Sequence, residues 1–580
     1  MRATAERKRF SSISLRRPTA SQLVKLALLL APFAIAAVAF FWKFRSMGLS
    51  HWDEYIFVGT AASMSPSVGW GHLYPYDPPL FALFLFAMFK RFGFYDYVAV
   101  ATSGIIAFAL CIAVFVWVNR QYDRWTAIVS TSILATIELF IFYAKMALSD
   151  MAFTFFFSLS VFAYFGAIKN QKGSSYLLAG LLLTLAIATK YNGFQPLLVV
   201  AIFIPFFHSM LLRSRGRTPR EAIVGWARAV LHSLSGLWLS AAPAVIFVVL
   251  FLAFLGQPFH LTDFRAMLGI TRDLVPRVSE GLAYFVRVVY PTKGGVFRIR
   301  PFITVGFYSD ALTHFIAAPV LALSVIGAVK GIMKRSLVEI LLTIWAGFIF
   351  VYFASTATTY VRVLLPAVVP IAILAGTGLT WLLAALDQSL RTQKASTLRK
   401  RNVRALIEAG LLLAVIGVNV IWAAPAITDT HSAYRTAADF IVKNVPDGQL
   451  VWFTAQPIII TYLDMMRKQV RISDNISAIE QAYVIVLDFV AQSSPQWPQI
   501  QARISQMQLV FTVRNDVPVV NVLDWTDFSH LNSVISDPAR MSIRIYASAG
   551  QIPSYQADPV SPYAMIAGLM RRPAVLRRTP

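Results

Sequence analysis

Residues 24–55 read VKLALLLAPFAIAAVAFFWKFRSMGLSHWDEY, an apolar run followed closely by two acids. The apolar part, residues 24–44, is long enough to cross ~30 Å of hydrocarbon as a helix, which takes about 20 residues. Basic residues precede it, and no small-residue cleavage site stands before Trp42 and Lys43. The run therefore predicts an uncleaved first membrane span. Asp53 and Glu54 follow where the chain would leave the membrane.

The rest of the chain has the composition of a membrane protein. Of its 580 residues, 57% are hydrophobic and only 14% are charged, and the mean hydropathy is +0.62. The net charge of +24 could suggest nucleic acid, but most cations lie in short segments between apolar runs, as in cytoplasmic membrane loops. The single cysteine, Cys111, excludes an internal disulfide and a thiolate metal site.

Ten further apolar runs follow the first. They cover residues 97–118, 125–143, 150–168, 175–190, 194–212, 231–255, 314–333, 337–355, 362–385 and 404–424. Residues 79–92 are a doubtful twelfth run, because they would reach only about 21 Å as a helix. The sequence thus predicts a polytopic α-helical membrane protein with about 11 transmembrane helices.

Loop charges support the odd number of spans, because lysine and arginine are retained in short cytoplasmic loops. With eleven spans and the basic N-terminus inside, the later inside loops hold eighteen cations: Arg120, Arg124, Lys169, Lys172, Arg213, Arg215, Arg217, Arg220, Arg228, Lys330, Lys334, Arg335, Arg391, Lys394, Arg399, Lys400, Arg401 and Arg404. A twelfth span would leave five in short inside loops: Lys90, Arg91, Lys145, Lys190 and Arg362. Residues 79–92 are therefore expected to lie along the outer surface as an interfacial helix.

This parity divides the chain into three regions. Residues 1–23 form a basic cytoplasmic N-terminus, residues 24–424 form the membrane domain with outer loops 45–96 and 256–313, and residues 425–580 form an outer domain. The long outer loop 256–313 carries seven cations against four acids, an excess that can be incidental or can steer an anionic substrate.

The outer domain has a different sequence pattern. A helical stretch at 434–444 is followed by a Pro446-Asp447-Gly448 turn. Strand-like apolar runs then lie at 449–454, 483–488, 509–513 and 518–523. We expect a small α/β domain.

The first candidate site residues are the acids of loop 45–96. A carboxylate such as Asp53 or Glu54 can take the proton of an attacking hydroxyl. Ser50 followed by Asp53 is also a helix-capping pattern, with both acids in the first turn. Both interpretations remain open from spacing alone. Asp77, which precedes two prolines, is typical of a turn.

Three cations mark the predicted outer ends of spans. Lys145, Lys190 and Arg362 each stand there with little other charge nearby. Any one of them could be a snorkelling anchor. Together, on the face that should lack cations, they suit an anionic phosphate, which arginine binds bidentately and lysine as a point charge.

The sequence contains no clear motif for a metal or a nucleotide. The eight histidines include no pair at i, i+4 and there are no paired cysteines, so no metal site is indicated, although the pattern does not exclude a divalent metal. Lys293-Gly294-Gly295 lacks the spacing of a phosphate-binding loop. We expect no cofactor, and neither a nucleotide sugar nor ATP as the substrate.

Five stretches, taken in order, resemble the GT-C glycosyltransferases. They are Asp53-Glu54, the Pro-Pro-Leu run after Asp77, KMALSD at 145–150, TKYNG at 189–193, and Arg362 to Pro370. The most similar branch is that of the bacterial relatives of protein O-mannosyltransferases and of the lipid A aminoarabinose transferase. The resemblance runs from about residue 20 to residue 470.

The resemblance implies transfer of a sugar from a polyprenyl-phosphate carrier to an acceptor on the non-cytoplasmic side, usually with inversion. By position, Asp53 would be the catalytic base and Glu54 its support. The other roles it implies are donor-phosphate binding by Lys190, Arg362 and Lys145, and substrate contacts by Asp150, Tyr76, Asp77 and Tyr191. Two positions depart from the pattern, because the family commonly has a basic residue at the place of Asp77 and arginine at that of Lys145.

The resemblance also implies a bacterial inner membrane protein with a periplasmic C-terminal domain and an envelope acceptor, which could be a glycolipid, a polysaccharide or a protein. Two other classes remain open. A transporter or lipid flippase also needs charges near membrane depth, but would place them within spans and usually has two related halves. A non-catalytic assembly factor could use residues 425–580 to bind an envelope partner.

Overall fold

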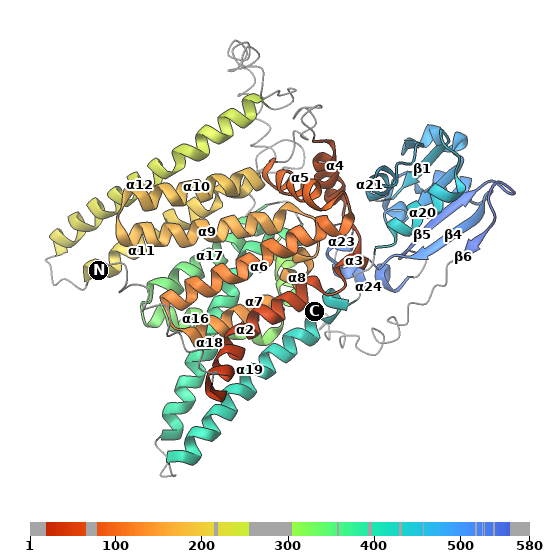
Figure 1. Ribbon diagram of the computed structural model, residues 1–580. Helices are drawn as coiled ribbons and strands as arrows, with labels where there is room; N and C mark the ends of the chain where they lie inside the picture. Colours follow the sequence, from red (N-terminus) through yellow and green to blue (C-terminus); the bar gives the residue numbers. More distant parts are fainter. Residues whose placement is uncertain are drawn as a thin grey trace, which may run out of the picture.

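The computed structural model describes residues 19–64, 78–213, 219–254, 304–356, 359–391, 397–428, 432–455, 457–516, 519–524, 526, 528–537 and 540–556. A helical bundle fills most of the molecule, and a small sheet with its own helices lies at one end (Figure 1). The bundle elements are α2 (Ala20–Phe41), α3 (Phe44–Met47), α4 (Trp52–Ser63), α5 (Leu80–Phe92), α6 (Asp96–Gln121), α7 (Arg124–Thr136), α8 (Glu138–Ala144), α9 (Ser149–Asn170), α10 (Gly173–Thr189), η1 (Tyr191–Phe194), α11 (Gln195–Arg213), α12 (Pro219–Phe254), α15 (Val305–Phe315), α16 (Ala318–Met333), α17 (Leu337–Ala354), η2 (Val361–Leu364), α18 (Leu365–Arg391) and α19 (Thr397–Thr428).

Each of the eleven apolar runs is helical in the described residues. Eight helical segments are long and apolar enough to cross a membrane, and the number rises to ten if the bent pairs α7–α8 (67°) and α15–α16 (110°) each count as one span. The run at 175–190 is the shorter apolar helix α10. The chain is therefore a multi-pass membrane protein.

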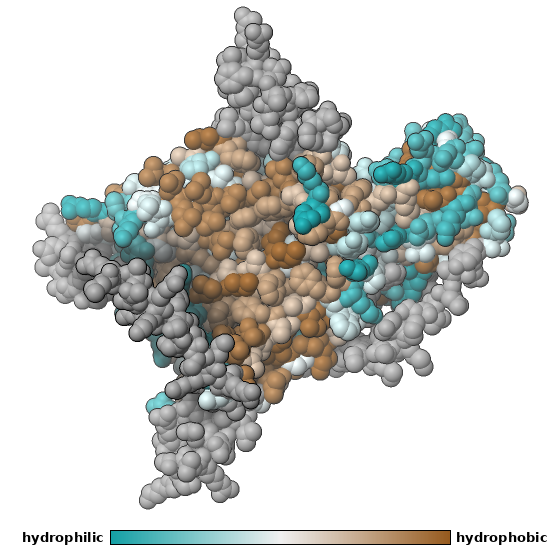
Figure 2. Space-filling model, in the orientation of Figure 1, coloured by the Kyte–Doolittle hydropathy of each residue, from teal (hydrophilic) through white to brown (hydrophobic). Residues whose placement is uncertain are grey.

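The surface of the bundle fits this assignment. Figure 2 shows apolar residues over the helices and hydrophilic residues gathered over the C-terminal sheet region. Large apolar side chains of the bundle are highly exposed, among them Trp238 at 78% and Leu413 at 68%. Such a surface suits hydrocarbon and would be unfavourable in water.

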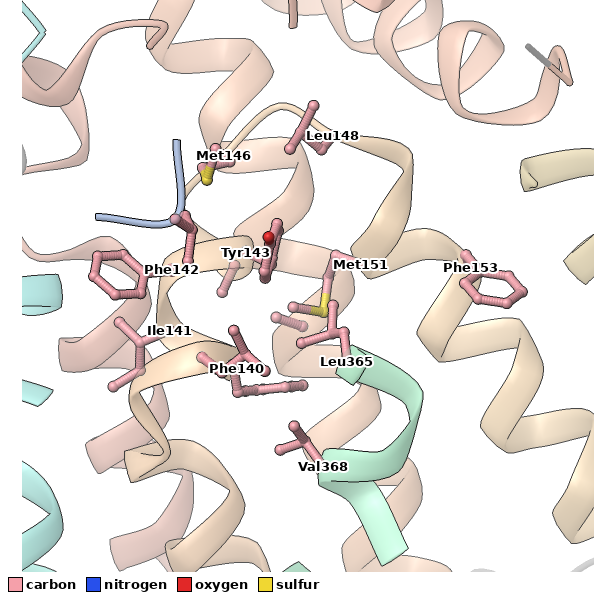
Figure 3. Packing of buried hydrophobic residues seen from close by; sticks show 14 of the residues in the cluster. Phe140, Ile141, Phe142, Tyr143, Met146, Leu148, Met151, Phe153, Leu365 and Val368 are labelled. Atoms are coloured by element: carbon pink, nitrogen blue, oxygen red, sulfur yellow. The ribbon is translucent and has the colours of Figure 1, made fainter. Parts of the chain in front are cut away.

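The core of the bundle lies between α8, α9, α17 and α18. Trp345 is fully buried and stacks on Phe157 with ring centroids 5.4 Å apart. Figure 3 shows Tyr143 of α8 packed with Met151 of α9 and Leu365 of α18. Leu365 directly follows η2, so this core supports the segment that carries Arg362.

The segment 79–92, which the sequence places outside the spans, is the 13-residue helix α5. It packs against α4 and α6. The Phe81 ring packs edge-to-face on Phe57 of α4, with ring centroids 5.3 Å apart. Residues 65–77 and 255–303, which include Tyr76, Asp77 and most of loop 256–313, lie outside the described residues.

The C-terminal region folds around a six-stranded mixed sheet of order β2-β1-β3-β5-β4-β6. Strand β1 pairs in parallel with β2 and β3, β5 is antiparallel to β3 and β4, and β6 is parallel to β4. Its elements are α20 (Tyr434–Asn444), β1 (Leu450–Thr454), α21 (Ile458–Met465), β2 (Arg471–Ser473), η3 (Ile476–Gln481), β3 (Val484–Leu487), η4 (Ala491–Ser493), α22 (Trp497–Ile504), β4 (Gln508–Arg514), α23 (Val519–Leu523), α24 (Phe528–Ser536), β5 (Ser542–Ala547) and β6 (Tyr555–Gln556).

The predicted elements of this region agree with the structure except at one run. The helix at 434–444 and the strand runs at 449–454, 483–488 and 509–513 correspond to α20, β1, β3 and β4. The predicted strand at 518–523 was wrong, because residues 519–523 form the short helix α23. A short, mainly apolar run such as VVNVL is ambiguous between helix and strand. Here tertiary contacts decide, since α23 packs on η2 of the bundle.

The C-terminal region holds the segment between α3 and α4 through buried hydrogen bonds. The Ser432 N–H donates to the Met47 carbonyl at 2.8 Å. The Tyr462 hydroxyl of α21 accepts the Leu49 N–H at 2.8 Å and donates to Asp96 at 2.9 Å. Gly48 has φ +69°, and a Cβ there would lie only 2.8 Å from the Tyr462 hydroxyl, so only glycine fits this approach.

We expect Tyr462→Phe to lower the free energy of unfolding by ~1–3 kcal/mol, because it leaves the buried Leu49 N–H without its acceptor and removes one donor from the buried Asp96 carboxylate. Thermal unfolding in detergent measures the change. Tyr95→Phe is the matched control, since the Tyr95 ring is 51% exposed. Equal melting temperatures for the two variants would contradict the bridging role of Tyr462.

Candidate active site

The segment that carries Asp53 is the start of α4. His51 is the N-cap residue, and its Nδ1 accepts the Asp53 N–H at 3.0 Å. Glu54, at the third helical position, accepts the His51 N–H at 2.7 Å, which completes a capping box. The cap therefore begins at His51 and not, as the alternative interpretation had it, at Ser50. Both acids lie in the first turn, where the helix dipole favours negative charge.

Glu54 is a structural anchor. Its carboxylate is fully buried and accepts three backbone N–H groups, from Ser50 (2.6 Å), His51 (2.7 Å) and Ala147 (2.6 Å). Burial raises the pKa of Glu54, and the three donors oppose that rise. Because Ala147 belongs to the KMALSD stretch, Glu54 joins two of the stretches singled out in the sequence.

Asp53 pairs with Arg362 of η2, which is 309 residues away in the sequence. The guanidinium also lies over the Tyr360 ring, 4.8 Å from its centroid. Burial raises the pKa of Asp53, but the charges of Arg362, His51 and Lys190, with the Arg362 hydrogen bond, outweigh it and hold the pKa at about 2. Asp53 is thus ionised at neutral pH.

A second ion pair joins α9 to the end of α10. Lys190 Nζ donates to Asp150 Oδ1 at 2.5 Å, and the Asp150 side chain is only 2% exposed. Lys190 is the C-cap residue of α10. The next turn, η1, comes so close to α10 that a Cβ at Gly193 would lie 2.2 Å from the Ile187 nitrogen. Glycine at position 193 therefore permits the turn that sets the direction of Lys190.

The two ion pairs belong to one charged cluster, which we call the site cluster: Asp53, Arg362, Lys190, Asp150, His51 and Asp524. Lys190 acts on Asp53, while Asp150 and Asp524 act on Arg362. The buried Tyr143 side chain, labelled in Figure 3, interacts electrostatically with Asp53, Asp150 and Arg362. Asp53, Lys190 and Arg362, which the sequence predicts in one site, thus lie together.

Lys145 has different partners. Its side chain is 2% exposed, and Nζ donates to the carbonyls of Ala426 (3.2 Å) and Ile427 (2.8 Å) at the end of α19. Cations at a helix C-terminus neutralise its free carbonyls and its dipole. This geometry favours helix capping for Lys145 over the predicted contact with a phosphate.

The remaining predicted site residues are placed as follows. Tyr191, in η1 directly after Lys190, is 4% exposed and so contributes to the core beside the cluster. Tyr76 and Asp77 lie outside the described residues. Within the described residues no group of three or more His, Cys, Asp or Glu side chains is arranged to hold a metal ion.

Sequence reasoning missed two members of the site cluster. His51 Nε2 lies 2.6 Å from Asp524 Oδ2, and Asp524 follows α23 in the C-terminal region. His51 lies two residues before Asp53 in the sequence, so its place near the site could have been predicted. Asp524 gives no local signal, because a single acid is ordinary in a polar domain.

Comparison with known proteins bears on the fold of the chain. Residues 76–253, less than half of the chain, match the family model for dolichyl-phosphate-mannose-protein mannosyltransferase. No curated protein sequence matches the chain. The fold is similar to that of ArnT from Cupriavidus metallidurans in the apo state, with TM-score 0.54 and 14% identity over 93% of this chain and 100% of that one.

It is also similar to the oligosaccharyltransferase AglB from Archaeoglobus fulgidus in complex with an inhibitory peptide and a dolichol-phosphate. That likeness has TM-score 0.51 and 15% identity over 81% of this chain and 70% of that one. An apo form of the Archaeoglobus fulgidus oligosaccharyltransferase is similar with a TM-score of 0.52 and 13% identity, over 91% of this chain and 75% of that one. The chain has the fold of the GT-C superfamily of glycosyltransferases.

If Glu54 is an anchor, Glu54→Ala should lower the free energy of unfolding by ~3 kcal/mol or more, since three buried N–H groups lose their acceptor at ~1–3 kcal/mol each. Chemical denaturation in detergent, with Glu480→Ala as the exposed control, measures this. A Glu54→Ala protein as stable as the control would show that the carboxylate does not hold the fold.

Proposed function

We propose that this protein is a membrane glycosyltransferase that moves a sugar from a polyprenyl-phosphate carrier to an acceptor hydroxyl, with inversion and with Asp53 as the general base. The observation that supports it most is the convergence of Asp53 and Arg362, from α4 and η2, with Lys190 acting on the same carboxylate. A base and phosphate-binding cations in one cluster are what such a transfer requires. The GT-C fold is consistent with this chemistry.

The ion pair between Asp53 and Arg362 gives the donor phosphate a specific task. A phosphate is a bidentate partner for a guanidinium and competes with a carboxylate for it. When Arg362 turns to the phosphate, Asp53 loses its strongest positive neighbour, so its pKa rises from about 2. The base therefore gains strength when the donor is in place.

In the transfer step, Asp53 accepts the proton of the acceptor hydroxyl, and the acceptor oxygen forms a bond to C1 of the sugar. The bond between C1 and the phosphate oxygen breaks, and its electron pair leaves with the carrier phosphate. Arg362 and Lys190 stabilise the charge that develops on that phosphate. The base and the leaving group lie on opposite faces of the sugar, which inverts the configuration at C1.

The proposal includes a location. Loop charges support a position on the non-cytoplasmic side, which is the periplasm for a bacterial inner membrane, for α4, the ends of α10 and η2, and the C-terminal region. Residues 425–580 would then form a periplasmic domain beside the site. An envelope acceptor, whether glycolipid, polysaccharide or protein, is accessible there.

The alternative function is that of a lipid flippase, because a polytopic membrane protein of this class also needs charged residues near membrane depth. The described members of the site cluster lie at helix ends and not at the middle of spans, which favours the enzyme. A panel of radiolabelled polyprenyl-phosphate sugars, tested with purified protein and envelope fractions, separates the two. Sugar transferred to an acceptor supports the enzyme, and lipid translocation without transfer supports the flippase.

Asp53→Asn should lower kcat by ~10²–10⁴-fold, the usual contribution of a general base, because the amide cannot accept the proton. Binding of a polyprenyl phosphate should persist, since Arg362 and Lys190 remain. Asp439→Asn, at an exposed position of α20, is the control. An unchanged kcat for the Asp53→Asn protein would show that Asp53 is not the general base.

Arg362→Lys keeps the positive charge but loses the fork that can bind a phosphate through two N–H groups. We expect the KM for the donor to rise about 10- to 100-fold, which corresponds to one charge-assisted hydrogen bond of ~1.5–3 kcal/mol. Steady-state kinetics with varied donor measure this. An unchanged donor KM would mean that the phosphate does not bind at Arg362.

A further inference from the structure

The C-terminal region contributes a charged side chain to the site cluster. Asp524 Oδ2 lies 2.6 Å from His51 Nε2, and the two side chains are only 13% and 7% exposed. Asp524 also acts electrostatically on Arg362 and Tyr143. A carboxylate of the C-terminal region thus contacts His51, which accepts the Asp53 N–H, and acts on Arg362, the ion-pair partner of Asp53.

A second contact fixes this part of the C-terminal region on the start of α4. Asn521 Nδ2 donates to the Ser50 carbonyl at 2.8 Å and lies 3.0 Å from the Ser50 hydroxyl. Asn521 and Asp524 are three residues apart, so the turn of α23 presents both to residues 50 and 51. The segment therefore holds its position on the cap without depending on the His51 contact alone.

His51 connects this segment to Asp53. Its Nδ1 accepts the N–H of Asp53, while its Nε2 lies against Asp524. A ring nitrogen that accepts a hydrogen bond carries no proton, so Nε2 carries it and donates to the carboxylate. The imidazole is thus a fixed bridge between Asp524 and the backbone of the proposed base.

We propose that Asp524 is a positioning residue that holds Asp53 in place through His51. This inference rests on the proposed function for the role of Asp53, but the physical link from Asp524 to α4 can be measured without any activity. Through this link the C-terminal region fixes the imidazole half of the cap on α4, while Glu54 fixes the other half from within the bundle.

The link also makes the cap sensitive to pH. The charged groups that face His51 are Asp524, Asp53, Glu54 and Arg362. Burial and the charge of Arg362 lower the pKa of His51, but the hydrogen bond and charge of Asp524, together with the charge of Asp53, outweigh them and raise it. Protonation at Nδ1 would replace the acceptor of the Asp53 N–H with a second donor. Acid should therefore loosen the start of α4, and Asp524 raises the pH at which this occurs.

Three variants separate the steps of the link. Asp524→Asn keeps the shape of the side chain and removes its charge. His51→Asn keeps a good N-cap residue for α4 but is too short to reach Asp524. Asp516→Asn, in the exposed pair with Arg514, is the matched control in the same region.

The first measurement needs no substrate. Histidine hydrogen–deuterium exchange followed by mass spectrometry reports the pKa of His51, and amide exchange reports the protection of residues 52–56. With Asp524→Asn we expect the His51 pKa to fall and amide exchange at the start of α4 to rise, whereas Asp516→Asn changes neither. An unchanged His51 pKa and unchanged protection with Asp524→Asn would overturn the proposal.

The second measurement uses sugar transfer. Asp524→Asn and His51→Asn should each lower kcat by about 10- to 100-fold, the cost of a base misplaced by ~1 Å, with little change in the donor KM. The double variant should be no slower than the worse single one. The lower His51 pKa should also move the acid limb of the Asp524→Asn pH profile to lower pH.

These measurements distinguish a failure of the proposed function from a failure of the link between Asp524 and Asp53. If the wild-type protein transfers no sugar, yet Asp524→Asn lowers the His51 pKa and raises amide exchange at the start of α4, the proposed function is contradicted and the link is supported. A wild-type protein that transfers sugar, with full kcat and an unmoved pH profile in Asp524→Asn, supports the function and overturns the link.

Discussion

The ion pair between Asp53 and Arg362 is the interaction on which the site depends. It joins the start of α4 to η2, two segments 309 residues apart in the sequence, and it holds opposite charges in a largely buried position. A buried charge is tolerated only when it is paired and hydrogen-bonded. Arg362 cannot leave Asp53 without a substitute for the carboxylate, and a donor phosphate is chemically suitable for that place.

The surrounding structure fixes the two ends of this pair. On one side, Glu54 ties the segment before α4 to the turn between α8 and α9 through three backbone N–H groups. On the other, the core of α8, α9 and α18 supports Leu365 directly after η2 (Figure 3). The C-terminal region adds the contacts of Tyr462, Asn521 and Asp524 to residues 49–51. The membrane bundle and the sheet region therefore meet at the proposed catalytic segment.

Much of the fold could be predicted from hydrophobicity alone. All eleven apolar runs are helical, because a chain that crosses hydrocarbon must satisfy its backbone hydrogen bonds internally. The short helix α23 was mistaken for a strand, since a short, mainly apolar run such as VVNVL fits either structure until packing decides. The strand β5, SIRIYA, was not predicted, although its polar and apolar residues largely alternate, which is typical of a half-buried strand.

The candidate site could be predicted in part, for a physical reason. Lys190 and Arg362 stood out because cations are unexpected at outer span ends, but the same argument selected Lys145, whose ammonium caps α19. Charge patterns show that a cation needs a partner and cannot show which partner it has. Asp524 escaped notice because its partner, His51, lies 473 residues away, a pairing that only the tertiary fold creates.

A structure of the protein with a polyprenyl phosphate bound would test directly whether the donor phosphate replaces Asp53 at Arg362. The phosphate should lie within hydrogen-bond distance of Arg362 and Lys190, with the Asp53 carboxylate released from the guanidinium and free to meet an acceptor. A phosphate bound elsewhere, with the Asp53–Arg362 pair unbroken, would contradict this replacement.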